Sequence, residues 1–308
     1  MNKGIVIKST GSWFSVKNDD NQIFECRIRG KIRLDDLKST NPVAVGDVVE
    51  FSLAEDNVGL ISKIYERKNY IIRKSSNLSK QHHIVASNID QAFLVITLAF
   101  PETSTLFIDR FLISAEAYRI PTIIVINKVD LYKSEKLSEL VNQIKSIYNP
   151  IGYKCIETSV VENVNIDLLR ELMCDKVSVF SGNSGVGKSS LINKIDSKLN
   201  IRVGEISDSH HKGKHTTTFA EMHHVSSGGY IIDTPGIKGF GLIDMKKEEM
   251  YHFFPEIFNY SAQCKYNNCT HVHEPNCAVI QHVKDGDISL SRYENYLNLI
   301  LSDEEKHR

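Results

Sequence analysis

The chain has 308 residues, of which 41% are hydrophobic and 24% are charged, and its net charge is -1. This composition is ordinary for globular protein and allows two or three domains. It excludes a generally basic nucleic-acid binder, so any such contact must come from local patches. No apolar run reaches the roughly 18 residues of a membrane span, and the N-terminus lacks the apolar core of a secretory signal. We expect a cytoplasmic protein with no membrane contact.

The N-terminal part, which we delimit as residues 1–68, reads as a series of short strands. Runs rich in β-branched and aromatic residues at 4–8, 13–16, 23–28, 48–51 and 59–64 are separated by Asn, Asp and Gly. This pattern predicts a small closed barrel of OB or SH3-like type.

Basic residues mark one strand of this barrel and the segment that follows it. If extended, residues 27–33 place alternating cations on one face, namely Arg27, Arg29, Lys31 and Arg33. Residues 63–83 add further cations, including Arg67 and Lys68. These residues are candidates for contact with RNA phosphates, although a solvated strand face explains them equally well.

The middle of the chain, residues 69–240, has the texture of an α/β domain. Strand-like apolar runs at 93–98, 122–126, 155–156, 177–180 and 230–232 alternate with helical patterns. The helical patterns cover 104–119, 134–148 and 188–195. This alternation predicts a parallel sheet covered by helices.

A phosphate-binding motif lies between the strand at 177–180 and the helix at 188–195. The pattern G-x-x-x-x-G-K-[ST] is met by Gly182, Asn183, Ser184, Gly185, Val186, Gly187, Lys188 and Ser189. Its backbone N–H groups would cradle phosphates, Lys188 would reach the β- and γ-phosphates, and Ser189 would bind Mg²⁺. A chance glycine-rich turn is the alternative, but the flanking strand and helix disfavour it.

A guanine-reading motif follows the strand at 122–126. It consists of Asn127, Lys128, Val129 and Asp130. The Asp130 carboxylate can accept two hydrogen bonds from guanine that adenine cannot supply in the same arrangement. Ser159, in a later loop, suits a backbone contact to the base. The alternative is a polar turn with Asp130 as a helix cap.

The motifs come in an unusual order, because the base motif precedes the phosphate motif. The same sheet can form if the chain is circularly permuted. Asp233 and Gly236 belong to an Asp-x-x-Gly motif after the strand at 230–232. At this position a P-loop enzyme carries the acidic residue that joins the P-loop Ser or Thr in holding Mg²⁺. In this order, the segment after Asp233 leads directly into the C-terminal part.

The polar segment at 209–218 fits a switch loop ordered by γ-phosphate and Mg²⁺, although a solvated loop would look the same. One of Thr216 and Thr217 would contact the metal, and the sequence does not choose between them. Ile237 stands where Ras-like enzymes carry a water-positioning Gln. Another group must therefore orient the attacking water, and His215 is the candidate.

The C-terminal part, residues 241–308, is predicted to be helical around a metal site. Three thiolates and an imidazole, from Cys264, Cys269, His271 and Cys277, would satisfy tetrahedral Zn²⁺ and leave no open position, so the site should be structural. His273 competes as the fourth ligand. The last helix is expected to bury a stripe formed by Leu290, Tyr293, Leu297, Ile300 and Leu301.

Together these motifs resemble one family, the circularly permuted GTPases that act on the small ribosomal subunit (RsgA, also called YjeQ or YloQ). The resemblance covers essentially the whole chain. It implies an OB-fold barrel and the four zinc ligands named above. It also implies slow GTP hydrolysis that the small (30S) subunit stimulates during its late maturation, including the release of assembly factors. His215 matches the histidine implicated in catalysis. Val160 is a small departure, since Ala is commoner there.

These considerations give one set of expected contacts and partners. We expect a monomer that binds GTP or GDP with Mg²⁺, one structural Zn²⁺, and the small subunit with its rRNA. A scaffold that binds RNA and uses nucleotide only as a switch is the main alternative, and an ATP-using P-loop enzyme is a third. The magnesium candidates are Ser189, Thr217 and Asp233. The expected GTP contacts are Asn127, Lys128, Val129, Asp130, Ser159, Gly182, Asn183, Ser184, Gly185, Val186, Gly187, Lys188, Ser189, Ser190, Asp233 and Gly236.

Overall fold

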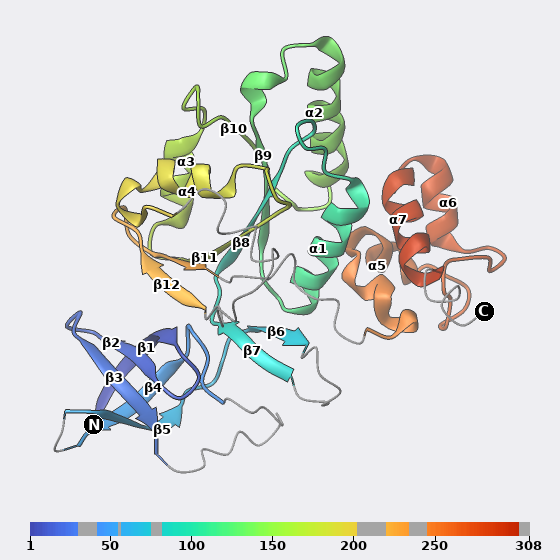
Figure 1. Ribbon diagram of the computed structural model, residues 1–308. Helices are drawn as coiled ribbons and strands as arrows, with labels where there is room; N and C mark the ends of the chain where they lie inside the picture. The colour runs from blue at the N-terminus through green and yellow to red at the C-terminus, as the bar shows by residue number, and fades with distance from the viewer. Residues whose placement is uncertain (30–41, 55–56, 75–81, 202–219, 234–244, 302–308) are drawn as a thin grey trace, which may run out of the picture.

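The computed structural model describes residues 1–29, 42–54, 57–74, 82–201, 220–233 and 245–301. Along the chain, a β-barrel is followed by a β-hairpin, a mixed α/β domain and a group of C-terminal helices (Figure 1). The hairpin lies between the barrel and the α/β domain, and the C-terminal helices lie beside helix α1 (Figure 1). The predicted multidomain fold is confirmed.

The barrel is built from β1 (Asn2–Ser9), β2 (Phe14–Asn18), β3 (Ile23–Ile28), β4 (Val48–Leu53) and β5 (Gly59–Ile64). The strands pair in the order β1-β2-β3-β5-β4, and β4 pairs back with β1. Alternate side chains point inward, so Phe14, Phe51 and Ile61 are fully buried. The closed five-strand order is that of an OB-fold, the first of the two barrel types that the sequence allows.

Strands β6 (Tyr70–Lys74) and β7 (His82–Ser87) form the hairpin, which the sequence did not predict. A buried carboxylate ties its base to the barrel. Asp47 receives hydrogen bonds from Arg67 Nε at 2.6 Å and from Ser87 Oγ at 2.6 Å. The Arg67 side chain is only 7% exposed. Arg67 therefore neutralises Asp47 and does not present a cation to RNA.

The sheet of the α/β domain contains β8 (Gln91–Ile96), β9 (Thr122–Asn127), β10 (Cys155–Thr158), β11 (Val177–Ser181), β12 (Glu221–His224) and β13 (Tyr230–Asp233). Their order is β10-β9-β8-β11-β13-β12, and only β12 runs antiparallel to its neighbour β13. Every residue of β8 is buried because helices cover both faces. The parallel-sheet prediction is confirmed.

Helices α1 (Thr105–Ala117) and α2 (Glu135–Tyr148) cover one face, where Leu94 and Ile96 contribute to the core. Helices α3 (Ile166–Met173) and α4 (Lys188–Ile195) cover the other, against Phe93 and Val95. Short 3-10 turns η1 (Val129–Leu131) and η2 (Ser197–Leu199) follow β9 and α4.

The circular permutation is visible in the chain order of the strands, because β9, which leads into the base motif, comes before β11, which leads into the phosphate motif. The chain first lays down β8, β9 and β10 in one direction, and then returns to place β11 on the free side of β8. The order of connection therefore reverses between β8 and β11. Ligands of open α/β sheets bind at the carboxyl ends of the strands at such a switch point. The phosphate motif after β11 begins at that place.

The barrel is joined directly to the edge of this sheet. Strand β1 pairs antiparallel with β12, with Lys8 opposite Glu221. The Lys8 ammonium lies 3.0 Å from the Glu221 carboxylate, and Lys17 Nζ donates to the Tyr230 hydroxyl at 3.1 Å. These contacts tie the barrel to β12 and β13, which lie in sequence between the predicted switch loop and the Asp-x-x-Gly motif.

The C-terminal part contains η3 (Lys247–Phe253), α5 (Pro255–Ser261), α6 (Ala278–Asp285) and α7 (Leu290–Leu301). Its apolar core includes Ile113, which belongs to helix α1. The expected stripe on α7 is partly wrong, because Leu290 is 60% exposed and Leu301 is 45% exposed. The buried face consists of Arg292, Tyr293, Asn295, Tyr296, Leu299 and Ile300.

Candidate nucleotide and metal sites

The phosphate motif forms a tight turn between β11 and α4. Gly182 has φ +144°, and a Cβ there would lie 2.1 Å from the carbonyl oxygen of Val95. Gly187 has φ +94°, and a Cβ there would lie 2.6 Å from the side-chain amide nitrogen of Asn127. Both positions therefore require glycine. The turn delivers the chain into the first turn of α4, where free backbone N–H groups favour an anion.

Lys188 is the first residue of α4, and its side chain folds back over the turn. Its ammonium donates to the carbonyl oxygens of Gly182 at 2.8 Å and Asn183 at 2.7 Å. The residue is 6% exposed, and burial lowers the pKa of Lys188 to about 8. Among the described residues, its hydrogen-bond partners are neutral carbonyl groups, so this partly desolvated cation gains much from an anion placed beside it. Ser189 is also buried, while Ser184 at the tip of the turn is exposed and Ser190 is half-buried.

Asn127, at the end of β9, joins the base motif to the phosphate turn. Its side-chain amide donates to the carbonyl oxygen of Val186 at 2.9 Å. Its side-chain oxygen accepts from Thr158 Oγ1 at 3.0 Å. Asn127 is 1% exposed and Thr158 is fully buried. One buried side chain thus holds together the ends of β9, β10 and the phosphate turn.

Asp130 lies in η1, next to the loop that follows β10. Its carboxylate accepts a hydrogen bond from Ser159 Oγ at 2.6 Å, and Ser159 Oγ in turn accepts from the backbone N–H of Glu162 at 3.0 Å. Asp130 is half-buried, so the residue keeps some access to solvent. Its neighbour Val129 begins η1.

Lys128 bridges the phosphate turn and the loop between β8 and α1. Its ammonium donates to the carbonyl oxygens of Gly185 and Phe100, each at 2.7 Å. A residue that the sequence did not single out supports this arrangement. The Tyr132 hydroxyl accepts from the Leu98 backbone N–H and donates to the Asn127 carbonyl oxygen, each at 2.9 Å. Tyr132 could have been suspected only from its position two residues after Asp130.

Several predicted site residues lie outside the described residues. These are the switch and catalytic candidates His215, Thr216 and Thr217, together with Gly236 of the Asp-x-x-Gly motif. Asp233 ends β13, whose neighbour β11 leads into the phosphate turn. The sheet therefore brings the chain at Asp233 to the same edge as the phosphate turn.

The C-terminal helices enclose a cluster of three cysteines and one histidine. The ligand atoms of Cys264, Cys269, His271 and Cys277 all lie within 4.8 Å of one another. His271 Nδ1 is 3.5 Å from the sulfur atoms of both Cys264 and Cys277, and these two sulfur atoms are 3.9 Å apart. Tetrahedral zinc with thiolate ligands requires sulfur atoms about 3.8 Å apart. The donor set therefore fits a tetrahedral metal, while His273 is exposed outside it.

A carboxylate organises the loop that carries His271. Glu274 accepts from the backbone N–H and hydroxyl of Thr270, both at 2.6 Å, and from the N–H of Val272 at 3.0 Å. Burial raises the pKa of Glu274, but these hydrogen bonds outweigh it and bring the pKa down to about 2. The Tyr293 hydroxyl also donates to the His271 carbonyl oxygen at 2.8 Å. The loop is thus held by Glu274 within it and by Tyr293 of α7.

The basic face of the barrel is only partly within the described residues. Arg27 and Arg29 are exposed, and the Arg27 guanidinium lies 3.8 Å from the centre of the Trp13 ring. Lys31 and Arg33 lie outside the described residues. The described part thus presents a cation stacked on an aromatic ring.

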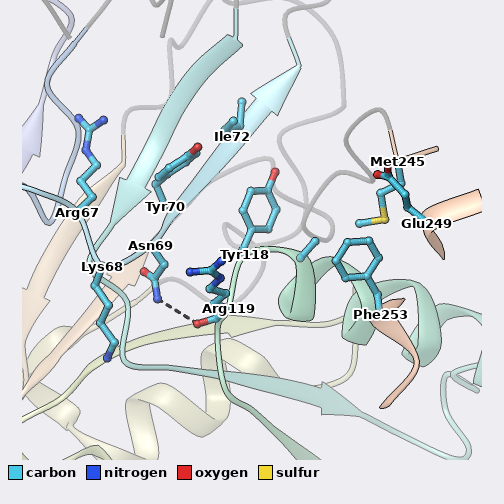
Figure 2. Close-up of a pocket in the computed structure, with 11 residues that line it drawn as sticks. Arg67, Lys68, Asn69, Tyr70, Ile72, Tyr118, Arg119, Met245, Glu249 and Phe253 are labelled. Carbon is cyan, nitrogen blue, oxygen red and sulfur yellow. Dashed lines mark hydrogen bonds between the residues drawn. The ribbon is translucent and has the colours of Figure 1, made fainter. Parts of the chain in front are cut away.

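A separate cavity of about 550 Å³ lies where the three parts of the chain meet (Figure 2). Tyr70 and Ile72 of the hairpin, Tyr118 after α1, and Met245 and Phe253 of the C-terminal part line it. Asn69 fastens the hairpin to this corner by donating to the Arg119 carbonyl oxygen at 3.3 Å (Figure 2). None of its described lining residues belongs to the phosphate or base motif.

The fold and the site together define a circularly permuted GTPase of the P-loop class. The family model for the RsgA GTPase matches residues 64–243, and that for the RsgA N-terminal domain matches residues 3–61. The chain belongs to the RsgA GTPase family, whose members hydrolyse GTP.

Curated relatives agree over nearly the full length. The small ribosomal subunit biogenesis GTPase RsgA 2 of Bacteroides thetaiotaomicron is 55% identical and covers 98% of this chain and 97% of its own. RsgA of Christiangramia forsetii is 52% identical, over 99% and 98% of the two chains.

Solved structures show the same fold. YjeQ from Thermotoga maritima has a TM-score of 0.79 at 36% identity, over 98% of both chains. YloQ, described as a circularly permuted GTPase, has a TM-score of 0.77 at 31% identity, over 99% of this chain and 96% of its own.

Proposed function

We propose that this protein binds the small (30S) ribosomal subunit and assists its late maturation through a slow GTPase cycle that the subunit stimulates. The observation that carries the GTPase part is the 2.9 Å contact from Asn127 to the Val186 carbonyl oxygen, which joins the base motif to the phosphate motif. The ribosomal part rests on relatives named small ribosomal subunit biogenesis GTPases that match at 52–55% identity over nearly the whole chain.

In this proposal the base motif reads guanine. Asp130 accepts from the ring N–H and the exocyclic amine, Lys128 covers the base plane, and Ser159 supports the base loop. Residues Gly182–Ser189, with Ser190 behind them, hold the phosphates. The half-buried Asp130 carboxylate and the buried Lys188 ammonium support these roles, since each has capacity for a ligand of the right charge.

Magnesium accompanies the nucleotide in this family of enzymes. We assign it to Ser189, Thr217 and Asp233, and we assign orientation of the attacking water to His215. Gly236 would approach the γ-phosphate. The support is the order of the motifs, with Ser189 buried at the start of α4 and Asp233 at the end of a neighbouring strand.

The metal in the C-terminal cluster is proposed to be one structural Zn²⁺. Three sulfur donors and one imidazole nitrogen are the ligands that zinc prefers, and four of them leave no position for substrate. Glu274 would act behind the ligands by holding the His271 loop. The metal would then stabilise the C-terminal part and take no part in hydrolysis.

RNA contact is proposed for the barrel face formed by Arg27, Arg29, Lys31 and Arg33. The stacked pair of Arg27 and Trp13 supports this, since such surfaces suit both phosphates and unpaired bases. We further propose a cytoplasmic monomer with domain boundaries at 1–68, 69–240 and 241–308. Among the described residues, no helix is long and apolar enough to cross a membrane.

The decisive experiment is GTP turnover titrated with purified small ribosomal subunits. We expect slow turnover that rises and saturates with subunit concentration, and that falls in His215→Ala. Turnover that neither responds to subunits nor depends on His215 would favour the RNA-binding scaffold with nucleotide as a switch only. Preference for ATP over GTP in a parallel competition would exclude the guanine assignment.

A further inference from the structure

Helix α1 contributes to two hydrophobic cores at once. Its residues Ile108, Phe111 and Leu112 pack in the core of the GTPase sheet, whereas Ile113 is fully buried in the core of the C-terminal helices. The C-terminal helices stand beside α1 (Figure 1). The C-terminal part therefore packs against α1, the helix that directly follows β8.

A buried charge network fastens this contact. Arg292 of α7 donates to Asp109 of α1 at 2.6 Å, and to both carboxylate oxygens of Glu256 of α5 at 2.7 and 3.1 Å. Asn295 and the Tyr148 hydroxyl also donate to Asp109, at 2.6 and 2.7 Å. Arg292 is 1% exposed and Asp109 is fully buried. Such a network has a narrow range of acceptable geometries, because each displaced partner leaves a buried charge unpaired.

The N-terminal end of α1, one turn before Asp109, continues into the loop that contacts the nucleotide motifs. The β8–α1 loop, residues 97–104, is braced within itself, since Thr97 Oγ1 donates to the Pro101 carbonyl oxygen at 2.5 Å and the Thr103 N–H donates to Thr97 O at 2.9 Å. Lys128 holds the Phe100 carbonyl oxygen of this loop, and Tyr132 holds the Leu98 N–H. The same Lys128 ammonium contacts the phosphate turn at Gly185.

We propose that the β8–α1 loop and the first turns of helix α1 couple the guanine site to the C-terminal part. Lys128 makes the contact at Phe100 of the loop, and Arg292 makes the contact at Asp109 of the helix. A nucleotide that packs under Lys128 selects the state in which Lys128 also holds Phe100. That state fixes the position of the first turns of α1, and with them the position of Asp109, which binds Arg292. By linkage, docking of the C-terminal part strengthens nucleotide binding to the same degree. The inference rests on the proposed guanine role of Lys128.

Amide hydrogen exchange on the full-length protein, with and without GDP and Mg²⁺, tests this first. We expect slower exchange in residues 182–192, in α1 and in α7. Protection of residues 182–192 with unchanged exchange in α7 would overturn the coupling and leave GTP binding intact. No protection at residues 182–192 would instead count against the proposed function.

A double-mutant cycle on the Kd for fluorescent GDP gives the second test. Arg292→Lys keeps the charge but disturbs the network, and we expect it to weaken GDP binding about fivefold. In a Lys128→Ala background the same change should have less than about a twofold effect, because the link is already broken.

Asn295→Ala, which removes one hydrogen bond to Asp109, replaces Arg292→Lys in the cycle if that variant does not fold. His282→Gln alters contacts inside the C-terminal part only and should leave the Kd unchanged. Equal effects of Arg292→Lys in both backgrounds would refute the proposal.

Discussion

The side-chain amide of Asn127 and the carbonyl oxygen of Val186 lie 2.9 Å apart, although 59 positions separate the two residues in the chain. Asn127→Ala leaves that carbonyl and the Thr158 hydroxyl without their partner inside a buried junction. An unsatisfied buried polar group costs about 1–3 kcal/mol, so we expect GDP binding to weaken roughly tenfold or more. Titration of fluorescent GDP measures this. Thr158→Val, which removes only one of the two contacts, should have a smaller effect; unchanged affinity in Asn127→Ala would contradict the junction's role.

Asp130 provides a test of base recognition. Asp130→Asn replaces one of the two acceptor oxygens with an NH2 donor, so it should weaken GTP binding by orders of magnitude. It should improve binding of XTP, whose base carries a carbonyl where guanine has its exocyclic amine. Competition binding with GTP, XTP and ATP measures the change. Asp167→Asn, at an exposed position on α3, is the matched control and should retain the wild-type preference. A variant Asp130→Asn that still prefers GTP would remove Asp130 from the base site.

Lys188 predicts a pH dependence of nucleotide binding. Burial holds the pKa of Lys188 at about 8 in the free protein, and phosphate oxygens beside the ammonium would raise that pKa. Binding therefore takes up a proton above pH 8, so affinity is constant below that pH and falls as the pH rises. Calorimetry of GDP binding at pH 8.5, in two buffers of different ionisation enthalpy, should show uptake of roughly half a proton or more. Absence of uptake would show that Lys188 is charged in both states.

The Asp47–Arg67 pair predicts where the barrel is most sensitive to mutation. Arg67→Met leaves the Asp47 carboxylate buried without its cation, which costs about 3–5 kcal/mol. The neighbouring pair Lys68–Asp90 is exposed, and loss of Lys68 should cost about 1 kcal/mol or less. The chain has one tryptophan, Trp13, which lies just before β2 of the barrel. Urea unfolding followed by its fluorescence measures both variants, and equal effects would refute the difference in burial.

The metal cluster predicts different outcomes for two histidines that are two positions apart. His271→Ala removes a donor and should release the metal, whereas His273→Ala should retain it because that side chain is exposed outside the cluster. Metal analysis should find about one zinc per chain in the wild type. Chelation should unfold the C-terminal part, which circular dichroism detects as lost helix. Retention of metal in His271→Ala would point to another fourth ligand.

Much of the fold could be predicted because its elements have strong local patterns. The barrel strands alternate buried and exposed residues, and α2 places Val141 and Ile144 on one face at helical spacing. The permuted order was also readable, since the order of the motifs in the chain is independent of their positions in space. These features depend on neighbours in sequence, which is what a single chain displays.

The elements that escaped prediction depend on distant partners. Helix α7 buries Arg292 and Asn295, two polar residues that lie outside the apolar stripe expected from the sequence. Both are buried because they donate to the Asp109 carboxylate, which lies 183 positions before Arg292 in the chain. In the same way, Arg67 was grouped with RNA-facing cations because Asp47 was not known to lie beside it. Tyr132 and the β8–α1 loop belong to the site through individual hydrogen bonds, at Asn127, Leu98 and Phe100, which no periodic pattern reveals.

Among the described strands, β12 would be the open edge of the GTPase sheet if the sheet stood alone. An open edge presents unpaired N–H and C=O groups that invite pairing with another chain. Here β1 of the barrel pairs with that edge at Lys8 and Glu221, and β1 is itself enclosed by the barrel on its other side. The barrel therefore covers the start of this edge, at Glu221, and gives some protection there against edge-to-edge pairing. A truncated chain without it would lose that protection whether or not its nucleotide site were intact.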